Sequence, residues 1–262
     1  MTDVVPPIPR IRAHTTVDVT IPQYSVMKVL AVWAAAALPM AALAWIVAPA
    51  VTSAFDGPAP FVGALLVCLT GGLIWQFVLV AALVWREQRS FRWSVLREAL
   101  WLRSPRSPRT GRVGGRLWLV VLPLLVGFAA EEAIPMVAHP ANHDLGIFLG
   151  SDAGHAFLDG AWGWFGLIAV LAIFNTVLGE ELLFRGFLLP RMNRAFGRGD
   201  WLANGILFAV YHLHTPWVIT SALVDTLLLA YPSKRYRSAW IGIAVHSAQS
   251  VVILAMTLTL VT

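Results

Sequence analysis

The run GPAPFVGALLVCLTGGLIWQFVLVAALVW, residues 57–85, contains no Asp, Glu, Lys or Arg and lies between Asp56 and Arg86. About 20 apolar residues of α-helix cross a hydrocarbon core of roughly 30 Å. This run is longer than that, so it predicts a transmembrane helix. A second uncharged run, residues 29–55, comes directly before it and predicts another.

The composition extends this interpretation to the whole chain. Charged residues make up only 13% of the 262 residues, hydrophobic residues make up 58%, and the mean hydropathy is +0.72. Soluble domains carry about 25% charged residues, so water-soluble enzymes, disordered chains and secreted disulfide scaffolds are excluded. We expect an all-α, polytopic transmembrane helix bundle of about seven spans, within a range of six to eight. The predicted spans are residues 29–55, 57–85, 116–137, 160–179 with a helical continuation, 201–214, 217–231 and 238–262.

The loops alternate in charge. Basic residues gather in segments 1–28, 86–116 and 185–198 and before the last span, whereas loop 139–159 has three Asp and no Lys or Arg. The positive-inside rule predicts that the basic segments, and with them the N-terminus, are cytoplasmic. The same rule explains the net charge of +5, so we expect a lipid bilayer and no nucleic acid as partner. Arg greatly outnumbers Lys, a bias typical of GC-rich coding sequences, and we take it as an indication of a bacterial source. We therefore expect the protein to lie in a bacterial cell membrane.

Ionisable residues inside a membrane are costly and indicate functional sites. In VLGEELLFRG, Glu181 and Arg185 are four residues apart, so an ion pair on one helix face is expected. Glu180 is rotated by about 100° from Glu181 and remains available for proton transfer. An ordinary Glu–Arg pair at a helix end would explain the same residues without a function.

Two further groups lie on later spans. Phe208 and His212 are four residues apart, whereas His212 and His214 are two apart and would point away from each other on a helix. In the last span, His246 and Ser250 share a face, and Gln249 would replace Ser250 only if the helix were rotated. Interhelical hydrogen bonds could account for each group alone. Together they predict a cavity open to the cytoplasm, equipped for proton transfer, metal binding or both.

The three groups together resemble the CPBP family of intramembrane proteases, which comprises the CAAX proteases and bacteriocin-processing enzymes and is also called Abi. The resemblance covers about residues 160–262. It therefore implies a catalytic transmembrane core at 160–262. The uncharged runs and the loop charges predict the rest of the chain: a cytoplasmic N-terminal segment at 1–28, and N-terminal transmembrane helices at 29–159 with an Arg-rich cytoplasmic loop at 86–116. The family motif E-E-x-x-x-R matches Glu180, Glu181 and Arg185, F-x-x-x-H matches Phe208 and His212, and H-x-x-x-N matches His246 with Ser250 in the place of Asn.

The resemblance implies an endopeptidase that hydrolyses a peptide bond in a membrane-associated protein or peptide, CAAX-like or other. Glu180 would activate a water, with Glu181 and Arg185 shaping the first motif, and His212 would position the water. His246 and residue 250 would stabilise the oxyanion. Glu180, His212 and His246 would also suit a Zn ion, although we favour the metal-free glutamate mechanism.

Three other hypotheses remain. Ser250 in the place of Asn favours a catalytically weak or inactive membrane scaffold or immunity protein that keeps the fold. A transporter would use Glu131, Glu132 and Asp225 as a proton relay, but their spread along the chain argues against one pathway. A metal site in the acidic loop would use His139, His143, Asp144, Asp152 and His155.

Overall fold

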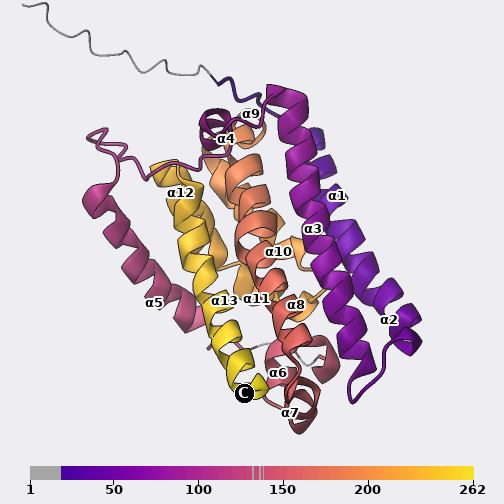
Figure 1. The fold of residues 1–262 in the computed structure, drawn as a ribbon. Helices are drawn as coiled ribbons and strands as arrows, with labels where there is room; N and C mark the ends of the chain where they lie inside the picture. Colours follow the sequence, from indigo (N-terminus) through magenta and orange to yellow (C-terminus); the bar gives the residue numbers. More distant parts are fainter. Residues whose placement is uncertain (1–18, 132, 136, 138) are drawn as a thin grey trace, which may run out of the picture.

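The chain folds as a helical bundle. The computed structural model describes residues 19–262 except 132, 136 and 138, and all its regular elements in this part of the chain are helical (Figure 1). The predicted all-α class is therefore confirmed. The predicted N-terminal segment falls partly on residues 1–18, which lie outside the described residues.

Four helical stretches are long and apolar enough to cross a membrane. The first, Val26–Ala54, includes α1 (Val26–Ala42) and α2 (Ala48–Val51), and the second is α3 (Pro60–Gln88). The third, Trp162–Arg191, begins with α8 (Trp162–Ile173), and the last is α13 (Ala239–Val261). These four match predicted spans, whereas the count of seven is not confirmed. In the described part of the predicted span 116–137, the regular elements are a 3-10 turn (Gly115–Val120) and α5 (Val121–Glu131), which stands at the side of the bundle in Figure 1.

The predicted fifth and sixth spans form one helical hairpin. It consists of α10 (Asp200–Tyr211), a turn, and a return through α11 (Ile219–Ala222), a π-helical turn (Thr226–Ala230) and α12 (Tyr231–Tyr236). An ion pair between Asp200 and Lys234 joins its two ends. At about 1.5 Å per residue, α10 is too short to cross a bilayer. The hairpin therefore enters the bundle and leaves it at the same end.

The two arms of the hairpin approach each other closely at Gly205. A Cβ at this position would lie 2.6 Å from the Cα of Thr226 and 2.3 Å from its hydroxyl oxygen. Because real side chains do not tolerate such contacts, only glycine permits this packing.

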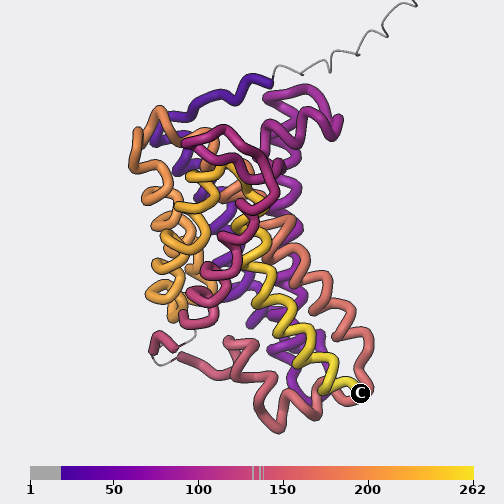
Figure 2. The backbone as a smooth tube through the Cα atoms, turned by 90° about the vertical axis from the view of Figure 1, so that its left-hand side faces the viewer, coloured from indigo at the N-terminus to yellow at the C-terminus, as the bar shows by residue number. Residues whose placement is uncertain are grey.

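The basic segments lie at one end of the bundle, as the alternation of loop charges requires. Figures 1 and 2 show which segments lie at this end. They are the first described residues, from residue 19 onward, and the helices α4 (Trp93–Ala99), α9 (Asn193–Phe196) and α12. The opposite end holds α6 (Leu145–Leu149), α7 (Asp152–Leu158) and the C-terminus.

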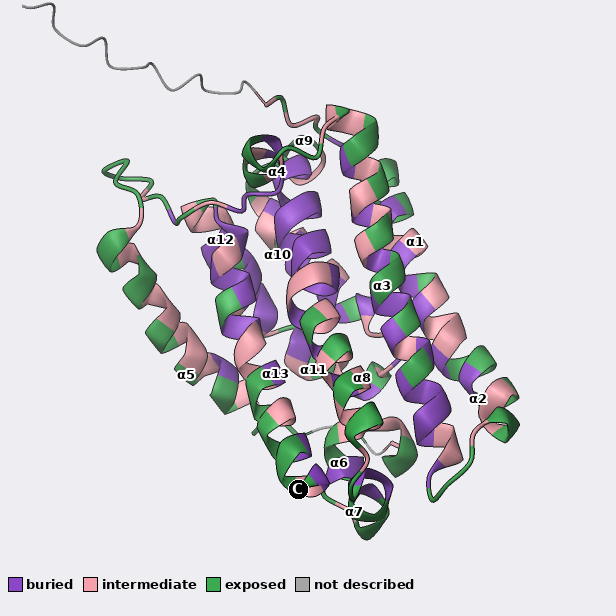
Figure 3. Cartoon of the chain, in the orientation of Figure 1, coloured by how far each residue is buried: buried purple, intermediate pink, exposed green. Residues whose placement is uncertain are grey.

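The helix Trp162–Arg191 is the most enclosed of the four long helices. Half of its most apolar stretch is buried, compared with 33–39% in the other three. Figure 3 shows buried residues concentrated on α10 and its neighbours, whereas α5 is mostly exposed or intermediate. We call the helix Trp162–Arg191 the central helix, because the remaining elements pack around it.

A buried charge cluster fixes the basic end of the central helix. The fully buried Arg191 guanidinium donates to Glu87 of α3 at 2.7 and 3.0 Å. It also donates to the carbonyls of Ala99 and Phe187. The Tyr24 hydroxyl donates to the same carboxylate, and burial raises the pKa of Tyr24. The cluster thus joins the central helix, α3 and the N-terminal segment.

Replacing Arg191 by alanine should destabilise the fold by about 3–5 kcal/mol, because it leaves the Glu87 carboxylate buried without its cation. The midpoint of thermal unfolding in detergent measures this effect. The matched control is Arg194→Ala, which removes an exposed guanidinium three residues away. Equal midpoints for the two variants would contradict the role given to the cluster.

Candidate active site

The central helix unwinds around two glutamates. Two π-helical turns, Phe174–Gly179 and Leu182–Leu188, flank Glu180 and Glu181. Both glutamates are buried, with 1% and 0% exposure. A π-turn inserts an extra residue into the helical register and is frequent at functional sites. Here the turns change the directions of the side chains on both sides of the acidic pair.

Glu181 is the centre of a buried ion cluster. Its Oε1 lies 2.9 Å from Nη1 of Arg185 and 3.1 Å from Nδ1 of His246. The ion pair expected from the spacing of Glu181 and Arg185 is therefore confirmed. The same carboxylate also binds the histidine of α13, so it connects the first motif to the third.

Phe208 connects the second motif to the other two. The guanidinium carbon of Arg185 lies 3.9 Å from the centre of the Phe208 ring, a cation–π contact that is strengthened by the burial of both side chains. The same ring lies edge-on to His212 at 5.0 Å and to His246 at 6.0 Å. The phenylalanine of F-x-x-x-H is thus a packing centre for all three motifs.

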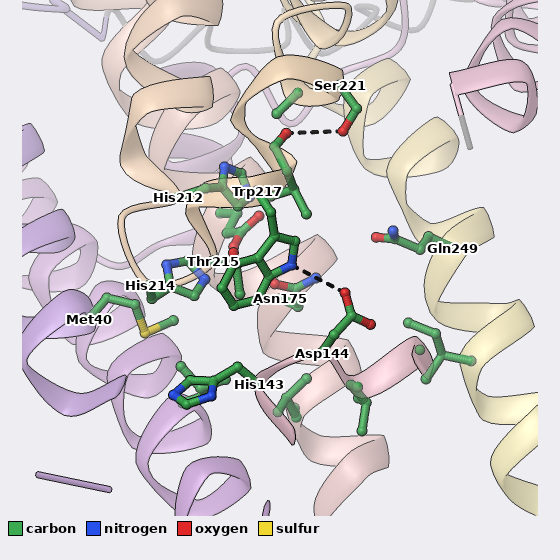
Figure 4. Close-up of a pocket in the computed structure, with 18 of the residues that line it drawn as sticks. Met40, His143, Asp144, Asn175, His212, His214, Thr215, Trp217, Ser221 and Gln249 are labelled. Atoms are coloured by element: carbon green, nitrogen blue, oxygen red, sulfur yellow. Dashed lines mark hydrogen bonds between the residues drawn. The ribbon is translucent and has the colours of Figure 1, made fainter. Parts of the chain in front are cut away.

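Glu180 faces a cavity of about 300 Å³. Its lining comes from α1, α3, α5, the central helix, α13, the tip of the hairpin and the loop after residue 140. Figure 4 shows the part around His212 and Gln249. Of the six site residues expected from the sequence, the cavity brings together Glu180, His212 and His246. Glu181, Arg185 and Ser250 lie outside its lining. Polar residues that the sequence reasoning did not place in one site complete it, namely Glu131, Asn142, His143, Asp144, Asn175, His214, Thr215, Ser221, Asp225 and Gln249.

A short hydrogen-bond chain holds Glu180. Gln76 Nε2 of α3 donates to the Tyr211 hydroxyl at 2.5 Å, and that hydroxyl hydrogen-bonds to the Glu180 carboxyl group. Glu180 Oε2 has no hydrogen-bond partner among the described residues. One side of the carboxyl group is therefore fixed, and the other can bind a water or a substrate.

The hairpin tip presents His212 and His214 to the same cavity. Helix α10 ends at Tyr211, and His212 is its C-cap. The two imidazoles stack with ring centres 5.5 Å apart, so the expectation that they point apart was wrong because the helix ends before them. His212 Nδ1 donates to the Phe208 carbonyl at 3.0 Å, which leaves Nε2 of the neutral ring as an acceptor.

The structure separates Ser250 from the cavity. Its hydroxyl lies 3.3 Å from the Ala172 carbonyl and 3.2 Å from the Thr176 hydroxyl, between α13 and the central helix. Gln249 lines the cavity instead, together with Asn175. The expectation that Gln249 could reach the site only if the helix were rotated was wrong. Gln249 follows His246 by three residues, and both side chains lie on the face of α13 that lines the cavity.

Asp225 and Glu131 also meet in this cavity. Asp225 is 4% exposed, and its side chain hydrogen-bonds to Glu131 of α5. These acids are distant in the sequence but adjacent in the fold, so the argument from their spread was wrong for this pair. Glu132, the third acid of the transporter hypothesis, lies outside the described residues.

The acidic loop closes the end of the cavity away from the basic segments. His139 Nε2 lies 3.2 Å from an Asp144 carboxylate oxygen, and the His139 ring stacks on Trp217 with ring centres 4.6 Å apart. The Trp217 indole donates to the same carboxylate. His143 stacks on Trp45, and burial lowers its pKa. The hairpin tip and the loop thus hold each other through aromatic contacts.

Neither predicted metal site fits the donor geometry. Zinc requires three or more His, Cys, Asp or Glu donors around one point. Within the described part of the chain, no three such side chains are arranged to hold a metal ion. This applies both to the set Glu180, His212 and His246 and to the histidines and aspartates of the acidic loop.

The comparison with protein families agrees with this arrangement. The family model described as type II CAAX prenyl endopeptidase Rce1-like matches residues 162–252. These residues form an Rce1-like domain. The domain contains the central helix, the hairpin and the part of α13 that carries His246, so the resemblance predicted from three motifs is confirmed. It supports a hydrolase of the protease class and, with the apolar helices, an integral membrane protein. No curated protein and no solved structure matches the chain.

Within the Rce1-like domain, Gly242 allows α13 to approach the ion cluster. A Cβ at Gly242 would lie 2.3 Å from Glu181 Oε2 and 3.1 Å from the Ser233 hydroxyl oxygen. Gly242→Ala should therefore displace Glu181 from Arg185 and His246 and destabilise the fold by about 1–3 kcal/mol.

Thermal unfolding of Gly242→Ala and Gly166→Ala checks this prediction. Gly166 lies within α8, and a Cβ there would have no neighbour within 4 Å, so alanine should be neutral or stabilising through its helix propensity. A Gly242→Ala protein as stable as the control would rule out the tight packing described for Glu181.

Proposed function

We propose that the chain is an intramembrane endopeptidase that hydrolyses a peptide bond in a membrane-associated protein or peptide, with a water activated by Glu180. One observation carries the proposal: Glu180, His212 and His246, all within the Rce1-like domain, line one cavity, and a Glu180 oxygen has no hydrogen-bond partner among the described residues. A buried carboxylate with a free oxygen is what a general base requires.

The attack on the substrate begins with proton transfer. Glu180 accepts a proton from a water, and Nε2 of His212 accepts the second hydrogen bond of that water and fixes its direction. Tyr211 and Gln76 hold the Glu180 carboxyl group in place. The water oxygen bonds to the substrate carbonyl carbon, and the carbonyl oxygen takes up the electron pair of the C=O π bond. When this oxyanion re-forms the C=O bond, the C–N bond breaks and protonated Glu180 passes its proton to the leaving nitrogen.

The negative charge on the carbonyl oxygen requires donors placed in advance. His246 is oriented by Glu181 through Nδ1, so its protonated ring would donate from Nε2. Gln249 and Asn175 line the same cavity, and each carries a neutral amide NH₂ group. We assign Ser250 to the packing of α13 against Thr176, and Glu181 and Arg185 to the support of His246. No step is assigned to a metal ion, because the donors do not converge on one point.

We further propose that the basic end of the bundle faces the cytoplasm of a bacterial cell, with residues 1–28 and loop 86–116 on that side. The clustering of basic segments supports this orientation. Glu180 is nearer to Arg191, at the basic end, than to Trp162. The catalytic carboxylate would thus lie within the membrane, in a core of residues 160–262 packed against helices from 29–159, and closer to the cytoplasmic surface.

Glu180→Gln should lower cleavage by about 10²–10⁴-fold, since the amide cannot accept the proton but has nearly the same shape. The measurement is cleavage of a membrane-proximal peptide by the purified protein in liposomes, with thermal unfolding as the check on folding. Glu98→Gln, which changes a partly exposed carboxylate of α4, is the matched control. Unchanged cleavage in Glu180→Gln would refute the proposal.

The same variant separates the enzyme from the alternative, a scaffold or immunity protein suggested by Ser250. A scaffold would retain its cellular phenotype in Glu180→Gln, and the unmodified protein would cleave nothing. An endopeptidase would lose both cleavage and phenotype in this variant.

Gln249→Leu should lower kcat by about 10²–10³-fold, as loss of an oxyanion donor does in other hydrolases. Ser250→Ala should lower kcat much less, because it removes only a packing hydrogen bond between two helices. Measuring kcat for both variants on one peptide decides whether Gln249 or Ser250 is the oxyanion donor. A large loss of kcat in Ser250→Ala, with no loss in Gln249→Leu, would contradict this assignment and identify Ser250 as the oxyanion donor.

A further inference from the structure

The cavity is lined by four acids and four histidines; the histidines are His143, His212, His214 and His246. Four carboxyl-bearing residues face it, and none of the described residues that line it is Lys or Arg; the acids are Glu131, Asp144, Glu180 and Asp225. Most carboxylates inside a protein have a cation or several donors next to them. The four acids differ in whether such a cation or donor lies next to the carboxyl group.

Asp144 already has polar partners. Its carboxylate binds His139 and accepts from the Trp217 indole. Glu180 has the Tyr211 hydroxyl on one side and is the proposed catalytic base. These two acids therefore have assigned roles, and the Asp225–Glu131 pair does not.

Asp225 has an unsatisfied oxygen that belongs to the cavity wall. The residue is 4% exposed, and its Oδ1 has no hydrogen-bond partner among the described residues. Its side chain hydrogen-bonds to Glu131. Because two carboxylates cannot hydrogen-bond without a proton, the pair holds one proton and retains one negative charge.

The cationic groups close enough to act on Asp225, His246 and Arg185, are already paired with another carboxylate. His246 lines the cavity, and its Nδ1 is bound to Glu181. The guanidinium of Arg185 is fully buried, pairs with Glu181 and stacks on Phe208, and it does not belong to the cavity lining. His143, at the far end of the lining, has its pKa lowered by burial. A buried, unpaired anion costs free energy, so a cation that enters with the substrate would remove that cost.

We infer that this site selects a peptide segment carrying a lysine or arginine side chain close to the scissile bond, with the cation bound at Asp225, and disfavours a segment with a carboxylate there. The inference rests on the proposed function and adds a substrate class to it. Basic residues are enriched at the cytoplasmic ends of membrane-spanning segments. A bond cut near such an end would bring a basic side chain into the cavity.

Equilibrium binding tests this selection. Three labelled apolar peptides with amidated C-termini differ only in a central lysine, norleucine or glutamate, and fluorescence anisotropy reports their binding to the full-length protein in non-ionic detergent. The Glu180→Gln background keeps the peptides intact and isolates Asp225. We expect the lysine peptide to bind about tenfold or more tightly than the norleucine peptide, and the glutamate peptide to bind most weakly.

A substitution at Asp225 locates the preference. Asp225→Asn, added to the same background, should bring the ratio of lysine to norleucine affinity to within about twofold of one. The matched control, Asp159→Asn, removes an exposed carboxylate at the end of α7 and should leave the ratio as it was. Equal binding of the two peptides, or a lysine preference that survives Asp225→Asn, would overturn the inference.

Cleavage by the protein with Glu180 intact separates this inference from the proposed function. Absence of cleavage of every peptide would refute the endopeptidase, while the affinities would still decide the role of Asp225. Glu180-dependent cleavage with equal affinities would refute only the selection of basic segments.

Discussion

The site depends on the interactions of the Glu181 carboxylate with Arg185 and His246. This carboxylate binds Arg185 one turn along its own helix and His246 on the last helix, with no exposed surface at Glu181 or Arg185. Removing one member of a buried ion cluster leaves the others with an uncompensated charge. The register of the central helix, the depth of α13 and the position of Phe208 over the guanidinium are therefore mutually dependent. Glu180, the next residue, is left to face the cavity.

Sequence alone could predict the elements that depend on local composition and spacing. Uncharged runs predict the four long helices because the bilayer imposes a minimum length, and i, i+4 spacing predicts the pair of Glu181 and Arg185. The three motifs predicted that Glu180, His212 and His246 belong together. The family match covers the same region, and the cavity contains all three.

The remaining features could not be predicted because they depend on where helices end and how they turn. His212 and His214 face one cavity because α10 ends at Tyr211, and helical periodicity does not apply beyond that residue. The two π-turns shift the register around Glu180, and no residue pattern announces them. Gln76 did carry a signal, as the one amide in an otherwise apolar run. Its partner Tyr211 is distant in the sequence, so only the fold identifies it.

The shortness of the hairpin helices has a consequence for how the protein is made. Segments of this length are not inserted into a bilayer on their own, and helices that are inserted associate only afterwards. The hairpin must therefore dock between helices that are already in place. Its tip supplies Tyr211, His212 and Asp225, whereas Glu180 and His246 arrive on long helices. During biosynthesis the cavity that holds Glu180, His212 and His246 is thus completed last, when the hairpin docks.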